Sequence, residues 1–211
     1  MNGISQSVTT EYVGLVLASS SPRRHALIKS LHIGLPVKIM SSEADETVVP
    51  EWSPAQIVEQ LSVRKARAVR QVLKKTESDA GPSVIVGADT IVVLDGEVLG
   101  KPKDANEAKE MLSRLQGRSH EVYSGIACIE TGGDREIVKH RVTRVYMKPL
   151  DSPRIERYVA SGEPMDKAGS YAAQGLGAVF VDRIEGCYFN VVGLSVSLLA
   201  DLLLEFGIET I

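Results

Sequence analysis

Short apolar runs alternate along the chain with stretches of helical periodicity. Apolar runs predict strands, over about residues 13–18, 35–40, 84–94, 120–130 and 135–148. Apolar positions at helical spacing predict helices, over about residues 22–31, 54–75, 105–116, 153–162 and 194–206. Tight hairpins are expected at two dipeptides: Asp95-Gly96, returning through 97–99, and Glu185-Gly186, joining 178–184 to 188–192. Interleaved strands, helices and hairpins predict an α/β fold with a mixed, twisted β-sheet and flanking helices.

The ends and the length of the chain suggest a simple domain organisation. Residues 1–11 are polar and lack the apolar segment of a signal peptide, so we expect a flexible leader there. The remaining residues, 12–211, are expected to form a single domain. A chain of 211 residues is long enough to bury a substantial core, as one domain or two small lobes.

The composition narrows the classes of function. Hydrophobic residues at 44% and charged residues at 24% are ordinary for a globular protein. A formal net charge of −3 argues against general nucleic-acid or membrane binding, so any basic site must be local. Cys128 and Cys187 lie in apolar runs, which predicts buried, reduced thiols and a cytoplasmic location. No zinc-type spacing and no apolar run of membrane-spanning length occur.

A pair of arginines occupies an unfavourable place at the start of the first predicted helix. Ser21 is expected to be the N-cap and Pro22 the first helical residue, so Arg23 and Arg24 fall in the first turn. Cations at this positive end of the helix dipole cost roughly 0.3–1 kcal/mol, and no acidic residue lies between positions 12 and 42. The missing negative charge could belong to a bound phosphate. The alternative is a solvated basic turn paired with distant acids.

Other Ser-Pro pairs provide a comparison within the same chain. The pair at 53–54 is followed by Glu59, and the pair at 152–153 lies between Asp151 and Glu156. Ser-Pro is therefore an ordinary helix start in this protein. The uncompensated arginine pair is the unusual feature.

Asp89 interrupts the apolar run over residues 84–94. A carboxylate in such a strand is unfavourable unless it is paired, hydrogen-bonded or bound to a metal. Gly87 beside it indicates a bulge or a close backbone approach. We expect Asp89 to be a general base or a Mg²⁺ ligand in a cleft. The alternative is a structural aspartate satisfied by backbone N–H groups.

Lys65 lies within the apolar stripe of the long second helix. Ile57, Leu61, Val69 and Val72 define that stripe at helical spacing. A lysine there can reach an anion in a cleft, or it can extend its head group past the edge of the core. The pattern leaves both interpretations open.

Further basic and amide side chains lie in two small-residue segments. Lys101 follows Gly100, and the Gly-rich stretch 166–175 carries Lys167 and Gln174. No Walker-type loop and no dinucleotide glycine pattern is present. Bound phosphates would therefore be held by Arg and Lys residues from separate segments.

Together these segments resemble the Maf family of nucleoside triphosphate pyrophosphatases, from Leu15 to Leu204. The resemblance rests on several motifs in the right order: Leu17-Ala18-Ser19-x-Ser21-Pro22-Arg23-Arg24, Glu46, Lys65-Ala66, Gly87-Ala88-Asp89-Thr90, Gly100-Lys101-Pro102, Met111-Leu112 through Gly117 and His120, Asp166-Lys167-Ala168-Gly169 and Gln174-Gly175. It implies two lobes around a central cleft and hydrolysis of a nucleoside triphosphate to the monophosphate and pyrophosphate. It also implies a divalent metal, with Mg²⁺ expected and Mn²⁺ or Co²⁺ as options, and a homodimer.

Three positions place the resemblance in one subgroup. Arg23, Thr90 and Gln174 are similar to the residues of the dTTP/UTP pyrophosphatases, whereas the subgroup acting on 7-methyl-GTP has Trp, Gln and Glu there. A glutamine offers a donor and an acceptor to a pyrimidine imide. The resemblance implies dTTP and UTP as preferred substrates, with modified pyrimidine nucleotides as further candidates. The chain departs from the family pattern at Leu194-Ser195, where Pro is usual, and at Ala172-Ala173, where Gly-Ile is usual.

The resemblance implies a role for each candidate residue. Asp89 would activate the water that attacks the α-phosphate and share the metal with Glu46. Ser19 would hold the triphosphate tail, and Thr90 and Gln174 would contact the nucleotide. Five basic residues would neutralise the phosphate charge: Arg23, Arg24, Lys65, Lys101 and Lys167. Two alternatives remain open: a nucleotide-binding regulator of cell division and septum formation without significant turnover, and a general phosphate-binding module.

Overall fold

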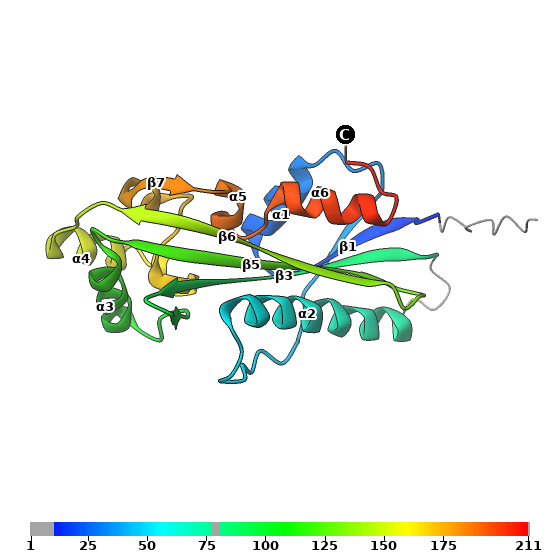
Figure 1. The fold of residues 1–211 in the computed structure, drawn as a ribbon, viewed down its shortest axis with the longest axis horizontal. Coiled ribbons are helices and arrows are strands. Elements are labelled where there is room, and N and C mark those ends of the chain that lie inside the picture. Colours follow the sequence, from blue (N-terminus) through cyan, green and yellow to red (C-terminus); the bar gives the residue numbers. More distant parts are fainter. Residues whose placement is uncertain (1–10, 77–80, 211) are drawn as a thin grey trace, which may run out of the picture.

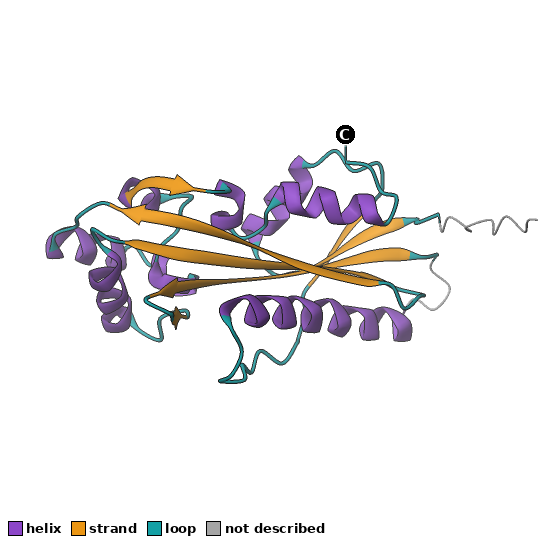
Figure 2. Ribbon diagram, in the orientation of Figure 1, coloured by secondary structure: helices purple, strands orange, loops and turns teal. Residues whose placement is uncertain are grey.

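The computed structural model describes residues 11–76 and 81–210. Residues 1–10 of the predicted leader lie outside this range. The described residues form a seven-stranded mixed sheet with helices on both faces (Figures 1 and 2). The predicted α/β class is confirmed.

The sheet combines a parallel and an antiparallel part. Its strands are β1 Gly14–Ala18, β2 Val37–Met40, β3 Ser83–Leu94, β4 Glu97–Leu99, β5 Ser119–Glu130, β6 Glu136–Met147 and β7 Val181–Glu185. The order is β2-β1-β3-β5-β6-β7, and β4 pairs with β3. Strands β2, β1 and β3 are parallel, whereas β3, β5, β6 and β7 are antiparallel to their neighbours.

One edge of β3 changes neighbour midway along the strand. Pairing with β1 ends at Ala18 opposite Gly87, and pairing with β4 begins at Val92 opposite Leu99. Between these points, residues 88–91 have no strand partner on this edge within the described sheet. The gap opens at the carboxyl ends of β1 and β2, the position at which α/β sheets usually bind ligands.

The helices cover the two faces unequally. They are α1 Pro22–Ser30, α2 Pro54–Thr76, α3 Ala105–Leu115, α4 Ser152–Ala160, α5 Tyr188–Val192 and α6 Val196–Glu205, with short 3₁₀ helices η1 Glu163–Asp166, η2 Ala168–Ser170 and η3 Leu176–Phe180. Helix α2 lies along one face, α1, α5 and α6 lie on the other, and α3 and α4 lie at one end of the long strands (Figure 1).

Strand β3 joins separate hydrophobic cores. Val84 and Val86 pack in a core with Leu199 of α6, whereas Val92 and Leu94 pack in a core with Leu112 of α3. Asp89 lies on the stretch of β3 between them. The sequence resemblance predicted two lobes with a cleft between them, and this arrangement of cores agrees with it.

Close packing of α2 against the sheet requires glycine on two neighbouring strands. A Cβ atom at Gly87 would clash with the Ser62 carbonyl oxygen and lie 2.9 Å from the Ala66 nitrogen. A Cβ atom at Gly125 of β5 would likewise clash with the carbonyl oxygen of Val58. The close approach expected at Gly87 is therefore the packing of α2. It brings the helix near enough for Lys65 to reach the sheet.

The second predicted hairpin is wrong. Residues 188–192 form the helix α5, and β7 pairs with β6 instead. The buried Asn190 side chain explains the helix, because its Nδ2 donates to the Val122 carbonyl oxygen at 3.0 Å and to Thr143 Oγ1 at 3.1 Å. Aromatic and β-branched residues favour strands locally, and these tertiary contacts override that preference.

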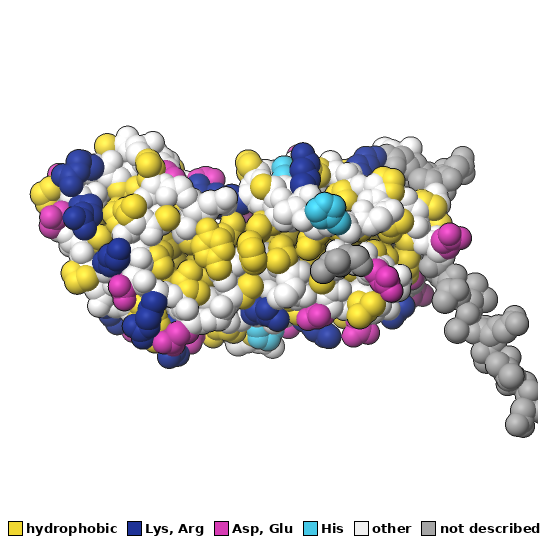
Figure 3. Space-filling view, turned by 90° about the horizontal axis from the view of Figure 1, so that it is seen from above, with side chains coloured by type: hydrophobic (Ala, Val, Ile, Leu, Met, Phe, Trp, Pro, Cys, Tyr) yellow, Lys and Arg dark blue, Asp and Glu magenta, His cyan; other side chains and the backbone are white. Residues whose placement is uncertain are grey.

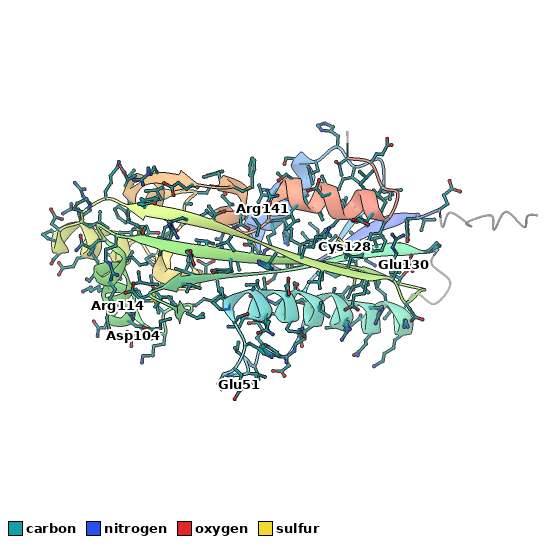
Figure 4. All side chains as sticks on the ribbon, viewed as in Figure 1. Glu51, Asp104, Arg114, Cys128, Glu130 and Arg141 are labelled. Atoms are coloured by element: carbon teal, nitrogen blue, oxygen red, sulfur yellow. The ribbon has the colours of Figure 1, made fainter. Side chains whose placement is uncertain are left out.

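Smaller predictions are also corrected. Val72 is 46% exposed, and Leu73 takes its place on the buried face of α2. Cys128 is buried in β5 (Figure 4), but Cys187 is partly exposed, so only one thiol is buried as predicted.

The face of the molecule that carries α1, α5 and α6 exposes both hydrophobic and charged side chains (Figure 3). The hydrophobic side chains form a band along its middle. Among the described residues, no helix combines the length and the apolar character needed to cross a bilayer.

Candidate active site

A cavity of about 550 Å³ opens where β3 lacks a neighbour. Its volume lies within the usual range for small-molecule sites. Every residue predicted for the site lines it: Ser19, Arg23, Arg24, Glu46, Lys65, Asp89, Thr90, Lys101, Lys167 and Gln174. Within the described chain, five basic residues line the cavity against three acidic ones, of which Asp166 was not predicted. The local basic site expected in an acidic protein is present.

Lys65 lies between two carboxylates. Its Nζ donates to Asp89 Oδ1 at 2.5 Å and lies 2.8 Å from Glu46 Oε1. The side chains of Lys65 and Asp89 are only 12% and 11% exposed, whereas that of Glu46 is 61% exposed. The hydrogen bond from Lys65, strengthened by its charge, lowers the pKa of Glu46. The open question about Lys65 is thereby answered, because it points into the cleft and not past the core edge.

Arg24 fills the open edge of β3. Its Nε donates to the Gly193 carbonyl oxygen at 2.7 Å, its Nη1 to Ala88 O at 2.9 Å and its Nη2 to Thr90 Oγ1 at 3.0 Å. Burial lowers the pKa of the guanidinium, and the charge of Asp89 opposes this shift. Arg24 therefore joins α1, β3 and the end of α5, besides lining the cavity.

Arg23 and the serines before it make fewer contacts with the rest of the fold than Arg24 does. Arg23 Nη1 lies 3.8 Å from Asp166 Oδ2. The arginine therefore has an acidic partner far away in the sequence, as the alternative interpretation of a solvated basic turn expected. Ser21 occupies the N-cap position, but its side chain makes no capping hydrogen bond. Instead, the buried Ser19 accepts from the Ser21 backbone N–H at 3.1 Å. The serine hydroxyl organises the turn at the end of β1.

The Thr90 hydroxyl belongs to a buried polar chain. Its Oγ1 accepts from Arg24, lies 2.8 Å from Ser124 Oγ and lies 3.3 Å from the Gly193 carbonyl oxygen. Ser124 Oγ in turn lies 3.0 Å from the Asn190 carbonyl oxygen. The Thr90 proton goes either to Ser124, when Ser124 donates to Asn190, or to Gly193. In both arrangements the Thr90 proton has an acceptor within the protein.

The segment carrying Lys167 and Gln174 is held by Glu163, which was not predicted. Its Oε1 accepts from the Leu176 backbone N–H at 2.9 Å and its Oε2 from the Gly177 N–H at 2.8 Å. Lys167 Nζ donates to the Glu163 carbonyl oxygen at 3.1 Å and also pairs with Asp166. One glutamate thus fixes both ends of the segment.

Sequence signals for these unpredicted residues were weak. Gly175 follows Gln174 with φ +110°, and a Cβ atom there would clash with Glu163 Oε1. A glycine at that place was a visible signal of a close approach, but the approaching residue was not identifiable. Ser124 and Asn190 have no distinguishing local pattern.

The cavity offers few protein ligands for a metal. Among the described residues, no group of three or more His, Cys, Asp or Glu side chains could hold one. The carboxylates of Asp89 and Glu46 nevertheless both contact the Lys65 ammonium, so the two carboxylates lie close enough together to share one cation. Such a pair fits Mg²⁺, which typically takes one or two carboxylates together with substrate phosphates and water.

The fold and the cavity together define a class: an α/β protein with a cavity rich in basic side chains at the carboxyl ends of its parallel strands. The chain belongs to the family described as Maf-like protein, whose model matches residues 14–206. A dTTP/UTP pyrophosphatase of Desulforamulus reducens is 50% identical over 197 residues, covering 93% of this chain and 98% of the relative. Those of Pelotomaculum thermopropionicum and Symbiobacterium thermophilum are each 50% identical, covering 92% of this chain and 96% and 94% of the relatives.

Proposed function

We propose that the protein hydrolyses nucleoside triphosphates, with dTTP and UTP preferred, to the monophosphate and pyrophosphate. The observation that carries the proposal is the buried Asp89 carboxylate in the wall of a cavity that five basic side chains also line. Relatives that are half identical over nearly their whole length are named dTTP/UTP pyrophosphatases. A phosphate-binding module alone would gain nothing from a carboxylate facing its anionic ligand.

In the proposed reaction, Asp89 takes a proton from a water molecule that attacks the α-phosphorus. The bond from this phosphorus to the bridging oxygen breaks, and pyrophosphate leaves. Lys101, Lys167 and Arg23 line the cavity and would stabilise the charge that develops on the leaving group. A bound Mg²⁺, held by Asp89 and Glu46, would supply further charge neutralisation.

Nucleotide choice is proposed to depend on Arg23, Thr90 and Gln174. Gln174 is exposed at the cavity and can donate and accept through its amide. Thr90, whose proton is used internally, would act by positioning Arg24 and the end of α5. The cytoplasmic location and the homodimer stay predictions.

Pyrophosphate release from dTTP and UTP with Mg²⁺ tests the proposal. We expect Asp89→Asn to lower kcat by about 10²–10⁴-fold, as usual when a general base is removed. Asp182→Asn on the exposed side of β7 is the matched control and should retain wild-type kcat. Equal activity of wild type and Asp89→Asn would exclude Asp89 as the base. Nucleotide binding without any pyrophosphate release by the wild type would favour the regulator of cell division instead.

A further inference from the structure

We propose that Lys65 occupies the position of the divalent cation, so that the protein binds metal together with the triphosphate and not in advance of it. This inference rests on the proposed function, because it concerns how the reacting complex assembles. Membership of the Maf-like family does not by itself assign an order of binding to metal and triphosphate.

The first observation is the position of the Lys65 ammonium. It lies 2.5 Å from Asp89 Oδ1 and 2.8 Å from Glu46 Oε1, and these oxygens belong to the two carboxylates proposed for the metal. Magnesium binds oxygen at about 2.0–2.1 Å and therefore requires the same space between the two carboxylates. An ammonium and a divalent cation cannot both lie there, since their charges repel at this distance.

The second observation is the environment of the pair. Asp89 and Lys65 are almost buried, so their mutual attraction is little screened by water. A metal ion arriving alone would have to displace Lys65 and leave its ammonium without an anionic partner in a cavity that also holds Arg23, Arg24 and Lys101. Uncompensated charge in a partly buried site is strongly unfavourable.

A triphosphate removes this obstacle. Its oxygens give the Lys65 ammonium a new partner, and the long flexible stem of a lysine allows the head group to move. Once Lys65 pairs with phosphate, both carboxylates become free for the metal. Linkage then requires metal and triphosphate to strengthen each other's binding by the same factor.

A purely structural role for Lys65 makes a different prediction. If the ammonium only neutralised Asp89, removing it would destabilise the protein without creating a metal site. Titration of Mn²⁺ into nucleotide-free protein, followed by electron paramagnetic resonance, separates the two possibilities because it does not depend on turnover.

We expect Lys65→Met to bind Mn²⁺ alone roughly 30-fold more tightly than the wild type, within the range usual for coupled sites. Lys101→Met is the matched control: Lys101 acts on Glu46 through its charge, but it is exposed and does not lie between the carboxylates. Its removal should change Mn²⁺ affinity by at most about threefold, as usual for an exposed charge. Lys65→Arg retains the cation and should keep Mn²⁺ binding weak.

The wild type supplies an independent arm if Lys65→Met fails to fold. Addition of α,β-imido-dUTP, in which the α–β linkage resists hydrolysis, should let the wild type bind Mn²⁺ more tightly than either the protein or the analogue does alone, since a triphosphate itself chelates the metal. The proposal is overturned if the wild type with the analogue binds Mn²⁺ no more tightly than the analogue alone, or if a folded Lys65→Met binds it no better than the wild type. If the binding results are as expected but no pyrophosphate is released, only the proposed hydrolysis fails.

Discussion

Side chains around the cavity differ in how far the protein already satisfies them. Arg24 donates to a carbonyl oxygen on β3 and to another at the end of α5, whereas Gln174 is exposed at the rim. His120 does not line the cavity: it is buried behind Tyr171, its Nε2 lies 2.7 Å from Tyr171 Oη, and its Nδ1 has no hydrogen-bond partner within the described structure. Burial lowers the pKa of His120 to about 4. His120, although part of the family motif, is therefore neutral near pH 7 and has a structural role.

His120 should make stability depend on pH. Its pKa is about 4 in the fold and about 6.5 when unfolded, so between these values the unfolded chain binds the extra proton and stability rises with pH. We expect the wild type to lose about 2 kcal/mol more than His120→Gln on going from pH 7 to pH 5. Urea unfolding of both proteins at the two pH values measures this difference. Equal losses would show that His120 does not titrate between the two states.

At the level of elements, the site depends on how closely α2 approaches the sheet. Gly87 and Gly125 create the space, and the buried face of the helix then brings Lys65 to Asp89. The helix could be predicted from its periodicity. Its distance from the sheet could not, because that distance is set by packing between segments far apart in the sequence.

Gly87→Ala should therefore impair both stability and activity. The added methyl group meets backbone atoms of α2, which cannot rotate away, and overpacking of this kind costs about 1–3 kcal/mol. Thermal unfolding and dTTP hydrolysis measure the two effects. Gly132→Ala is the control, because a Cβ atom there meets nothing within 4 Å. Wild-type behaviour of Gly87→Ala would contradict the packing argument.

The segment held by Glu163 offers a second test at this level. In Glu163→Gln the amide can accept from only one of the two backbone N–H groups, so the turn after Gln174 is held less firmly, whereas the bond from Lys167 to the backbone carbonyl of residue 163 remains. We expect KM for dTTP to rise about tenfold with a smaller change in kcat, equivalent to the loss of one strong hydrogen bond. Steady-state kinetics of dTTP hydrolysis measure the effect, and Glu156→Gln, at an exposed position of α4, is the control. An unchanged KM would mean that the segment does not need Glu163.

At the level of the whole molecule, the cavity is lined by residues 89–91 of β3, the stretch between the cores at the two ends of the strand. Arg23 comes from the segment after β1, and Lys101 and Gln174 come from segments beside α3 and η3. A triphosphate would contact residues of both parts. Its binding should therefore stabilise the protein as a unit.

Ligand binding should raise the free energy of unfolding. With Mg²⁺ and α,β-imido-dUTP at one hundred times Kd, the expected gain is about 2.7 kcal/mol. Denaturant titration measures it, with uridine as a control that lacks the phosphates. Hydrogen exchange should slow in α1 and in residues 166–175 together. Protection confined to one of these segments would show that the ligand does not bridge the two parts.

Local patterns along the chain were enough to predict the order and type of most elements and to single out the residues that line the cavity. Periodicity is a local property, and a charge inside an apolar run, such as Asp89 or Lys65, is visible without any partner. Other features depend on contacts between distant segments: the helix at 188–192, the positions of Glu163 and Ser124, and the polar partners of Thr90. The tertiary structure also decided that Lys65 lies between two carboxylates from different segments. Such distances arise only when separate elements pack, because nothing local along the chain encodes them.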